Sequence, residues 1–160
     1  MIEPFAAQIP PDTTLWTYQD GWMTFQYPAA GRIFQFEHGK QSQAVRLVWT
    51  DESGEKLRIQ IEPVRESLQA HAAARARYES RTTQLYANDI NRPPFQFDEH
   101  GWRTRYLFAD GLRAMLVFDL VFVETSAGVW SAAFSTAAPL YEANVWVFDQ
   151  LVKTLQFGTS

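Results

Sequence analysis

Cysteine is absent from this chain of 160 residues, and histidine occurs only three times. The absence of cysteine excludes disulfides, thiolate metal ligands and a thiol nucleophile. No apolar stretch is long enough for a signal peptide or a membrane span, because Arg, Asp or Glu interrupts each one. A Gly-rich phosphate loop, a nucleophile-elbow serine and an HExxH pattern are also lacking. We therefore expect a cytoplasmic protein without catalytic residues, cofactor or metal ion.

Positive charge is in short supply as well. The chain carries 14 Lys and Arg residues against 18 Asp and Glu residues, which gives a formal net charge of −4. The basic residues are scattered and form no stripe that a phosphate backbone would recognise. Nucleic acid is therefore not an expected partner.

Aromatic residues, by contrast, make up 15% of the chain, and hydrophobic residues make up 46%. Aromatic and β-branched side chains favour the half-buried surfaces of sheets, and a chain of this length can build one compact core. We expect an N-terminal lead over residues 1–14 and a single sheet-rich domain over residues 15–160.

Runs of alternating apolar and polar residues predict a series of strands. In one of them, Leu57, Ile59 and Ile61 face one way and the intervening polar residues face water. The last four runs follow one another closely and predict an antiparallel meander. The expected strands are 15–18, 22–28, 32–38, 44–50, 56–63, 95–97, 102–108, 112–124 and 129–136.

Two segments have helical periodicity instead. About residues 66–80, an Ala-rich segment places Leu68, Ala72 and Ala76 at helical spacing, which predicts a helix whose small-residue face lies close to a sheet. About residues 139–155, spacings of three and four predict a second helix, with Trp146 beside its stripe as an extension of the buried face or a contact surface. The residues of that stripe are Tyr141, Val145, Phe148, Val152 and Leu155.

The segment FQFEHG at 34–39 has a near copy, FQFDEHG, at 95–101. A pair of His/carboxylate metal sites, a repeated unit and two strands that end in similar turns would each explain the likeness. The flanking sequences differ, and the third histidine, His71, has no partner at ligand spacing. We favour two turns, in which glycine supplies a positive φ.

The Asp110-Gly111 pair predicts a two-residue hairpin, which would place Trp102 opposite Asp119 and Tyr106 opposite Met115; a three-residue loop would reverse these faces. An even-length loop then places Trp130 on the side of Asp119. The strand 112–124 is apolar on both faces and should be central, with one helix on each side. The sequence thus predicts an α+β fold, an α/β/α sandwich with a mostly antiparallel central sheet, a mid-chain helix and a C-terminal helix.

Asp119 is a lone carboxylate in this apolar strand, and a buried ionised carboxylate is costly unless it is paired or hydrogen-bonded. It is either a general base or ligand hook at the floor of an aromatic groove, or a structural residue that accepts bonds from Trp102, Thr104 or an arginine. We favour the structural role, because one carboxylate without a partner is not a mechanism. Arg103 and Arg105 suit either an anion hook or, more simply, a solvated strand edge.

The order of elements resembles that of the Mog1/PsbP-like group, which includes bacterial proteins of the DUF1795 type. The early GWMTFQYP is similar to an aromatic strand near the start of such domains, and the ending YEANVWVFDQLVKTLQF is similar to their final helix and closing Phe. The resemblance implies a non-catalytic protein that acts as a binding factor or chaperone, with no catalytic residues to carry over.

Three functions remain open from the sequence. The first is an adaptor whose aromatic sheet face, with Trp102, Tyr106 and Trp130, accepts an apolar segment of a partner protein. The second is a small-ligand-binding or enzymatic domain that uses Asp119 with Arg113. The third is a structural subunit that forms a homodimer through a sheet edge or Trp146.

Overall fold

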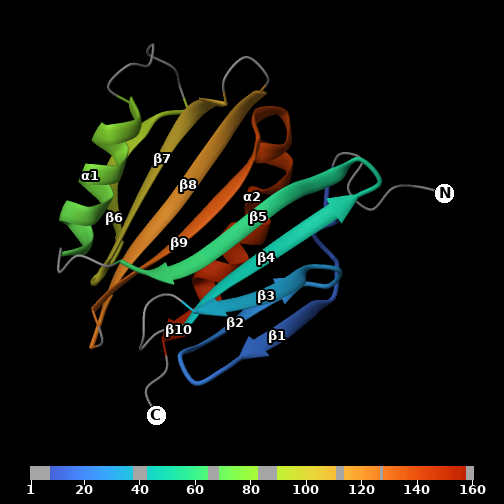
Figure 1. Ribbon diagram of the computed structural model, residues 1–160, viewed down its shortest axis with the longest axis horizontal. Coiled ribbons are helices and arrows are strands. Elements are labelled where there is room, and N and C mark those ends of the chain that lie inside the picture. Colours follow the sequence, from blue (N-terminus) through green and yellow to red (C-terminus); the bar gives the residue numbers. More distant parts are fainter. Residues whose placement is uncertain are drawn as a thin grey trace.

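The computed structural model describes residues 8–37, 43–64, 69–82, 90–110, 114–126 and 128–157. These ranges form an α+β fold with two antiparallel sheets and two helices (Figure 1). Every strand expected from the sequence is confirmed within a few residues of its predicted bounds. The strands are β1 (Leu15–Gln19), β2 (Met23–Pro28), β3 (Arg32–Glu37), β4 (Gln43–Asp51), β5 (Gly54–Pro63), β6 (Arg92–Asp98), β7 (Gly101–Asp110), β8 (Ala114–Thr125), β9 (Gly128–Ala137) and β10 (Gln156–Phe157).

The larger sheet has seven strands in the order β3-β4-β5-β9-β8-β7-β6, and the strand pairs described in it are antiparallel. After β5, the chain passes through α1 (Ala70–Thr82) to the far edge of the sheet, and the meander β6 to β9 leads it back. β9 consequently pairs with β5, and β3 and β6 are left as the two edge strands.

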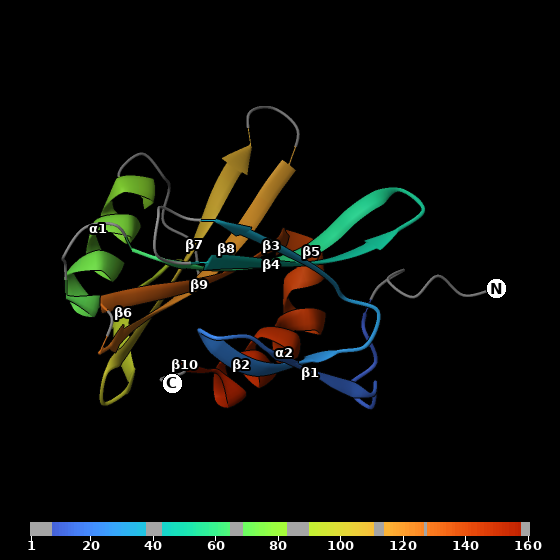
Figure 2. The same cartoon turned by 60° about the horizontal axis from the view of Figure 1, so that its bottom comes forward.

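One face of this sheet is covered by α2 (Ala138–Thr154) and by the small sheet β1-β2-β10 (Figure 2). The predicted inward alternation of β5 is confirmed, since Leu57, Ile59 and Ile61 are almost fully buried on this side. They share a core with residues of the small sheet, such as Phe25, and of α2, such as Phe148. Burial of this apolar surface is the main stabilising contribution to the fold.

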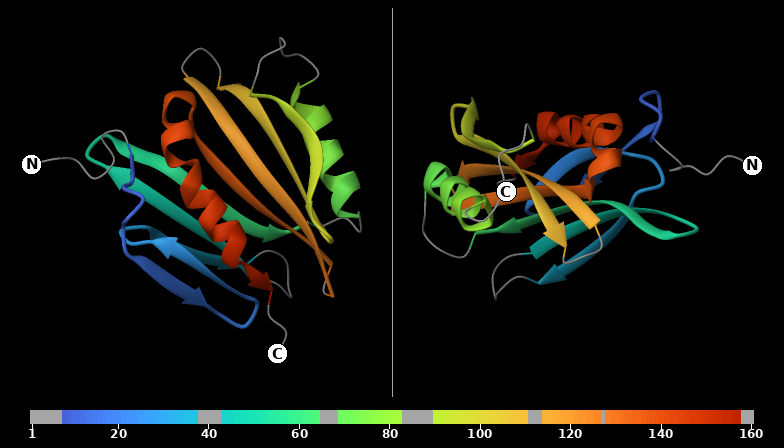
Figure 3. Two further views of the ribbon diagram at one scale, coloured as in Figure 1. Left: turned by 180° about the vertical axis from the view of Figure 1, so that it is seen from behind. Right: turned by 90° about the horizontal axis from the view of Figure 1, so that it is seen from above.

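The helix α1 lies on the opposite face of the sheet, over β6, β7 and β8 (Figure 3). A small-residue face is confirmed, but it consists of Ala70, Ala73 and Ala74, whereas the predicted Ala72 and Ala76 are exposed. Ala70 begins the helix, and its backbone N–H donates to the carboxylate of Glu124 at the end of β8 (3.0 Å). A helix lined with alanine can approach the aromatic side chains of β7 and β8 closely.

The apolar stripe of α2 is centred differently from the prediction. Its buried residues are Tyr141, Asn144, Val147, Phe148 and Leu151. Val145, Val152 and Leu155, which the spacing placed in the stripe, are only half-buried and lie at its margin. This side of α2 is therefore left partly open toward β6.

The end of the expected N-terminal lead is attached to α2. Asn144 Oδ1 accepts a hydrogen bond from the backbone N–H of Ile9 (2.8 Å), and the Trp146 indole donates to the Ile9 carbonyl (2.9 Å). Ile9 itself is buried. Trp146 therefore widens the buried face of α2, which is one of the two roles predicted for it from the sequence.

The predicted register of β7 and β8 is wrong. Asp110 pairs with Ala114, so three residues rather than two connect the strands, and the faces of β7 are reversed. Trp102 lies opposite Phe122 and Tyr106 opposite Phe118, which places both under α1. The predicted side of Trp130 is confirmed, since Phe134 pairs with Asp119 and Trp130 therefore lies on the same face of the sheet as Asp119.

The β6–β7 connection is the predicted turn at Glu99 and His100, but its glycine has a different role. Gly101 does not have a positive φ, whereas Gly54 and Gly128 do. A Cβ on Gly101 would lie 2.6 Å from the ring of Phe97, so the ring occupies the space that a side chain would need. The matching turn after β3, with His38 and Gly39, lies outside the described residues.

Candidate functional site

Asp119 lies at the centre of β8 on the face covered by α2, and its exposed fraction is 0%. Arg103, on the neighbouring strand β7, donates from Nε to Oδ1 (2.8 Å) and from Nη2 to Oδ2 (2.7 Å). The Tyr141 hydroxyl on α2 donates to Oδ2 as well (2.6 Å). This bidentate, charge-assisted geometry satisfies both carboxylate oxygens. These contacts agree with the structural role expected for Asp119. Arg103 is the arginine that pairs with it, and Trp102 lies on the other face of the sheet.

The partners of Asp119 are themselves held in place. Arg103 Nη2 also bonds Asp149 on α2 (2.8 Å), and Arg105 donates to the Tyr141 hydroxyl (3.1 Å). Burial lowers the pKa of Arg103, but the hydrogen bonds and charges of Asp119 and Asp149 more than offset this and raise its pKa overall. Burial and the Asp119 charge raise the pKa of Tyr141. At neutral pH this cluster therefore keeps a charged guanidinium and a protonated tyrosine, and it joins β7, β8 and α2.

The residues predicted from sequence to form one aromatic surface lie on two faces of the sheet. Trp102 packs against His71 of α1, with 4.3 Å between ring centroids, and Tyr106 is 1% exposed and stacked on Phe118. Trp130 is buried on the opposite face between Trp22 and Phe157. Arg113 lies outside the described residues. The predicted groove formed by Trp102, Tyr106 and Trp130 is therefore absent, because the register of β7 differs by an odd number of residues.

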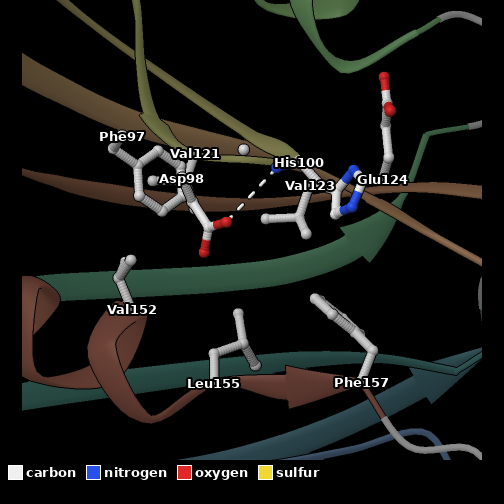
Figure 4. A pocket seen from close by; sticks show the side chains of 10 residues that line it. Phe97, Asp98, His100, Val121, Val123, Glu124, Val152, Leu155 and Phe157 are labelled. Carbon is white, nitrogen blue, oxygen red and sulfur yellow. Dashed lines mark hydrogen bonds between the residues drawn. The ribbon is translucent and has the colours of Figure 1, made fainter.

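An apolar recess instead opens between the β6–β7 turn, the end of β8 and the C-terminal end of α2 (Figure 4). Its volume is about 190 Å³. Phe97 is 36% exposed at one side, and Val152, Leu155 and Phe157 face it from the other, with Val121 and Val123 at the base. Asp98 and His100 lie at the opening, whereas the side chain of Glu124 points away from it toward α1, where its carboxylate accepts from Ala70. We call this feature the apolar recess.

A second, wider opening of about 390 Å³ lies beside the apolar recess, between β6, β7 and the first half of α2. Arg92, Arg105, Phe95, Tyr141, Glu142 and Val145 line it, together with Arg103 and Asp149 of the Asp119 cluster. We call it the arginine cleft. The two openings adjoin, because Phe95 and Phe97 are alternate residues of β6, and Asp149 and Val152 are one helical turn apart.

The sequence alone did not single out Phe97, Val152 or Phe157 as site residues. The sequence contains one signal for an open apolar surface: Val145 and Val152 make the apolar stripe of α2 wider than a buried face requires. Phe97 was recognised as part of a strand, but its proximity to Gly101 depends on the turn geometry. These positions could be identified only once β6 and α2 were placed side by side.

Comparisons with known proteins show similarity of fold alone. No family model matches the sequence, and no curated protein matches it. The chain is similar to a solved protein from Bacteroides thetaiotaomicron VPI-5482, with a TM-score of 0.54 and 11% sequence identity over 92% of this chain. The match covers 49% of the other chain, so this chain spans about half its length. Such a likeness agrees with an α+β fold and carries no statement about function.

Two further findings concern the residues that the structure describes. Neither α1 nor α2 has the length and hydropathy that crossing a membrane requires. Within the described ranges, no cluster of three or more His, Asp or Glu side chains could coordinate a metal ion.

Proposed function

We propose that this chain is a non-catalytic protein-binding domain, of the adaptor or chaperone type, which holds an apolar side chain of a partner protein in the apolar recess. The observation that carries the proposal is the uncovered apolar lining formed by Phe97, Val152 and Phe157. An exposed hydrophobic surface framed by polar residues is typical of an interaction site.

The size of the apolar recess favours a protein side chain over a free ligand. Pockets for drug-sized molecules measure roughly 300–1,000 Å³, and the recess has about 190 Å³. The acidic side chain at the rim, Asp98, complements a basic residue on the partner. The expected occupant is an apolar segment of a protein with a Lys or Arg close to its anchoring residue.

The proposal includes membership of the Mog1/PsbP-like group and its α/β/α sandwich. The order of the elements and the positions of α1 and α2 on opposite faces of the large sheet support this assignment. The alternative, a small-ligand-binding or enzymatic domain centred on Asp119, has less support, because Arg103 and Tyr141 already occupy both carboxylate oxygens.

The test compares two exposed phenylalanines on the two edge strands. Phe97 on β6 is 36% exposed and Phe34 on β3 is 46% exposed, so Phe34→Ser is a matched control for Phe97→Ser. Both variants and wild type are used for affinity capture from a lysate of the source organism, after circular dichroism has confirmed folding. The captured protein is then purified, and its Kd is measured by calorimetry.

We expect Phe97→Ser to weaken binding by about tenfold or more, since burial of an aromatic anchor contributes roughly 1.5–3 kcal/mol. Phe34→Ser should leave the Kd unchanged. Equal affinities of the two variants, or the absence of any partner that wild type captures, would contradict the proposal.

A further inference from the structure

The arginine cleft contains two arginines, Arg92 and Arg105, that form no ion pair with any carboxylate of the described residues. Arg92 and Arg105 are directly opposite each other in the β6–β7 ladder, an arrangement that is destabilising for like charges. Within the described part of the chain, no carboxylate oxygen lies within 4.0 Å of either guanidinium, in contrast to Arg103 between Asp119 and Asp149. An anion between Arg92 and Arg105 would remove this repulsion.

The two guanidinium groups are held in the cleft by contacts that leave donors available. Arg92 lies over the ring of Phe95, 3.7 Å from its centroid. Arg105 donates from Nε to the Ile90 carbonyl (2.9 Å) and from Nη1 to the Tyr141 hydroxyl (3.1 Å), and its Nη2 is not used in these bonds. These contacts fix the position of Arg105, which lowers the entropic cost of binding an anion.

The charges around the cleft favour a ligand with a single negative charge. Three positive charges, from Arg92, Arg103 and Arg105, are offset by the carboxylates of Asp119, Asp149 and Glu142. The cleft as a whole therefore has no net positive charge, and because each added negative charge meets these carboxylates, a phosphate dianion is disfavoured more than a monoanion. A planar carboxylate also matches the fork of donors that a guanidinium presents.

The remaining walls and the size of the cleft define the rest of the ligand. Phe95 and Val145 provide apolar surface beside the arginines. The volume of about 390 Å³ falls within the range of roughly 300–1,000 Å³ that is typical of small-ligand pockets. We propose that the arginine cleft binds one carboxylate attached to an apolar group, with the carboxylate between Arg92 and Arg105.

This carboxylate belongs either to a free organic acid or to an acidic residue of a bound protein segment. The apolar recess adjoins the cleft along α2, so a segment anchored in the recess could place an acidic side chain between the arginines. The carboxylate site does not depend on the proposed function, because its lining residues differ from those of the recess.

The experiment uses isotope-labelled protein at neutral pH and follows the Nε–Hε signals of the arginines by nuclear magnetic resonance. Hydrocinnamate is the free-acid probe, and hydrocinnamamide is its neutral match. A capped Phe-Glu dipeptide is the peptide probe, with a capped Phe-Gln dipeptide as its match. Inorganic phosphate tests the preference for a monoanion.

Arg92→Gln is the test variant, and Arg32→Gln is its matched control. Arg32 is also exposed on an edge strand and lies over a phenylalanine ring, 5.9 Å from the centroid of Phe34, but far from the cleft in the strand order. We expect saturable shifts at Arg105 with at least one carboxylate and not with its amide. Arg92→Gln should weaken this binding about tenfold, whereas Arg32→Gln should leave it unchanged.

Tighter binding of the Phe-Glu dipeptide than of hydrocinnamate would identify a protein segment as the source of the carboxylate, and the reverse would identify a free acid. The proposal is overturned if neither carboxylate binds, if the amides bind equally well, if phosphate binds more tightly, or if Arg92→Gln has no effect. Loss of partner binding in Phe97→Ser with intact hydrocinnamate binding would separate the two sites.

Discussion

Asp119 is a fully buried carboxylate whose charge is balanced by side chains from two other elements, Arg103 of β7 and Tyr141 of α2. Removing one partner from a buried ion pair leaves the other charge uncompensated, which costs far more than the pair itself contributes. At the scale of the residue, this cluster is a structural connection between the sheet and α2. In the same cleft, the exposed Arg92 and the half-buried Arg105 are the groups that would contact the proposed carboxylate.

We predict that Asp119→Asn lowers the free energy of unfolding by about 3 kcal/mol, because Arg103 loses its buried counter-charge. Partner binding by the folded variant should change much less than stability. The measurement is urea denaturation followed by circular dichroism. Asp149→Asn is the control, since Asp149 is 54% exposed and should cost under about 1 kcal/mol. A variant with the stability of wild type but no partner binding would overturn the structural role of Asp119.

Tyr18 makes stability sensitive to alkaline pH. Burial and the hydrogen bond to Asp20 raise the pKa of Tyr18 from 10.0 to about 12. The folded protein therefore holds this proton more tightly than the unfolded chain does. The resulting stabilisation is complete below pH 10.0 and is lost as the pH rises toward about 12.

Denaturation series across this pH range should show a decline in stability that is steeper for wild type than for Tyr18→Phe, which has no proton to lose. The raised pKa of Tyr141 adds to the decline in both proteins. Parallel curves for wild type and Tyr18→Phe would show that Tyr18 does not contribute to the pH dependence.

At the scale of the element, α1 shows how side-chain size sets the distance between a helix and a sheet. Ala74 is fully buried against the strands, and Ala72 on the same helix is exposed. We predict that Ala74→Leu destabilises the protein by about 1–3 kcal/mol, because a well-packed interface cannot accommodate the added volume. Ala72→Leu is the matched control and should change stability by less than about 0.5 kcal/mol. Equal thermal midpoints for the two variants would contradict the packing of α1.

The elements themselves could be predicted from the sequence because their periodicities are strong, as in β5 with Leu57, Ile59 and Ile61. The residues that pair with β7 could not be predicted, because the register depends on the length of the β7–β8 connection. When that length changes by an odd number of residues, the two faces of β7 are exchanged. Trp102 was therefore assigned to the face that Arg103 occupies. The need of Asp119 for a hydrogen-bonded partner was predictable from its apolar strand, but the identity of that partner was not.

The centre of a helical stripe is similarly uncertain from sequence. The same spacing that identified α2 placed Val145 and Val152 at the centre of its buried face, whereas Val147 and Leu151 lie there. Neighbouring residues on a helix differ by only part of a turn, so tertiary packing decides which of them are covered. The half-buried positions that result, Val145 and Val152, line the two openings.

At the scale of the whole molecule, the sheet is covered unevenly. The helix α1 lies over one face at the β6–β8 end, and α2 with the small sheet covers much of the other. Between α2 and the edge strand β6, the apolar recess and the arginine cleft remain open side by side. This arrangement places an apolar pocket and a pair of positive charges on the same face.

The most direct test of the proposed function is photo-crosslinking in cells of the source organism, with benzoylphenylalanine placed at position 97 or, as a control, at position 34. We predict that position 97 forms an adduct with one partner protein, that mass spectrometry maps the adduct to an apolar segment, and that position 34 does not form it. The absence of an adduct at position 97, or the same adducts at both positions, would contradict a partner-binding role for the apolar recess.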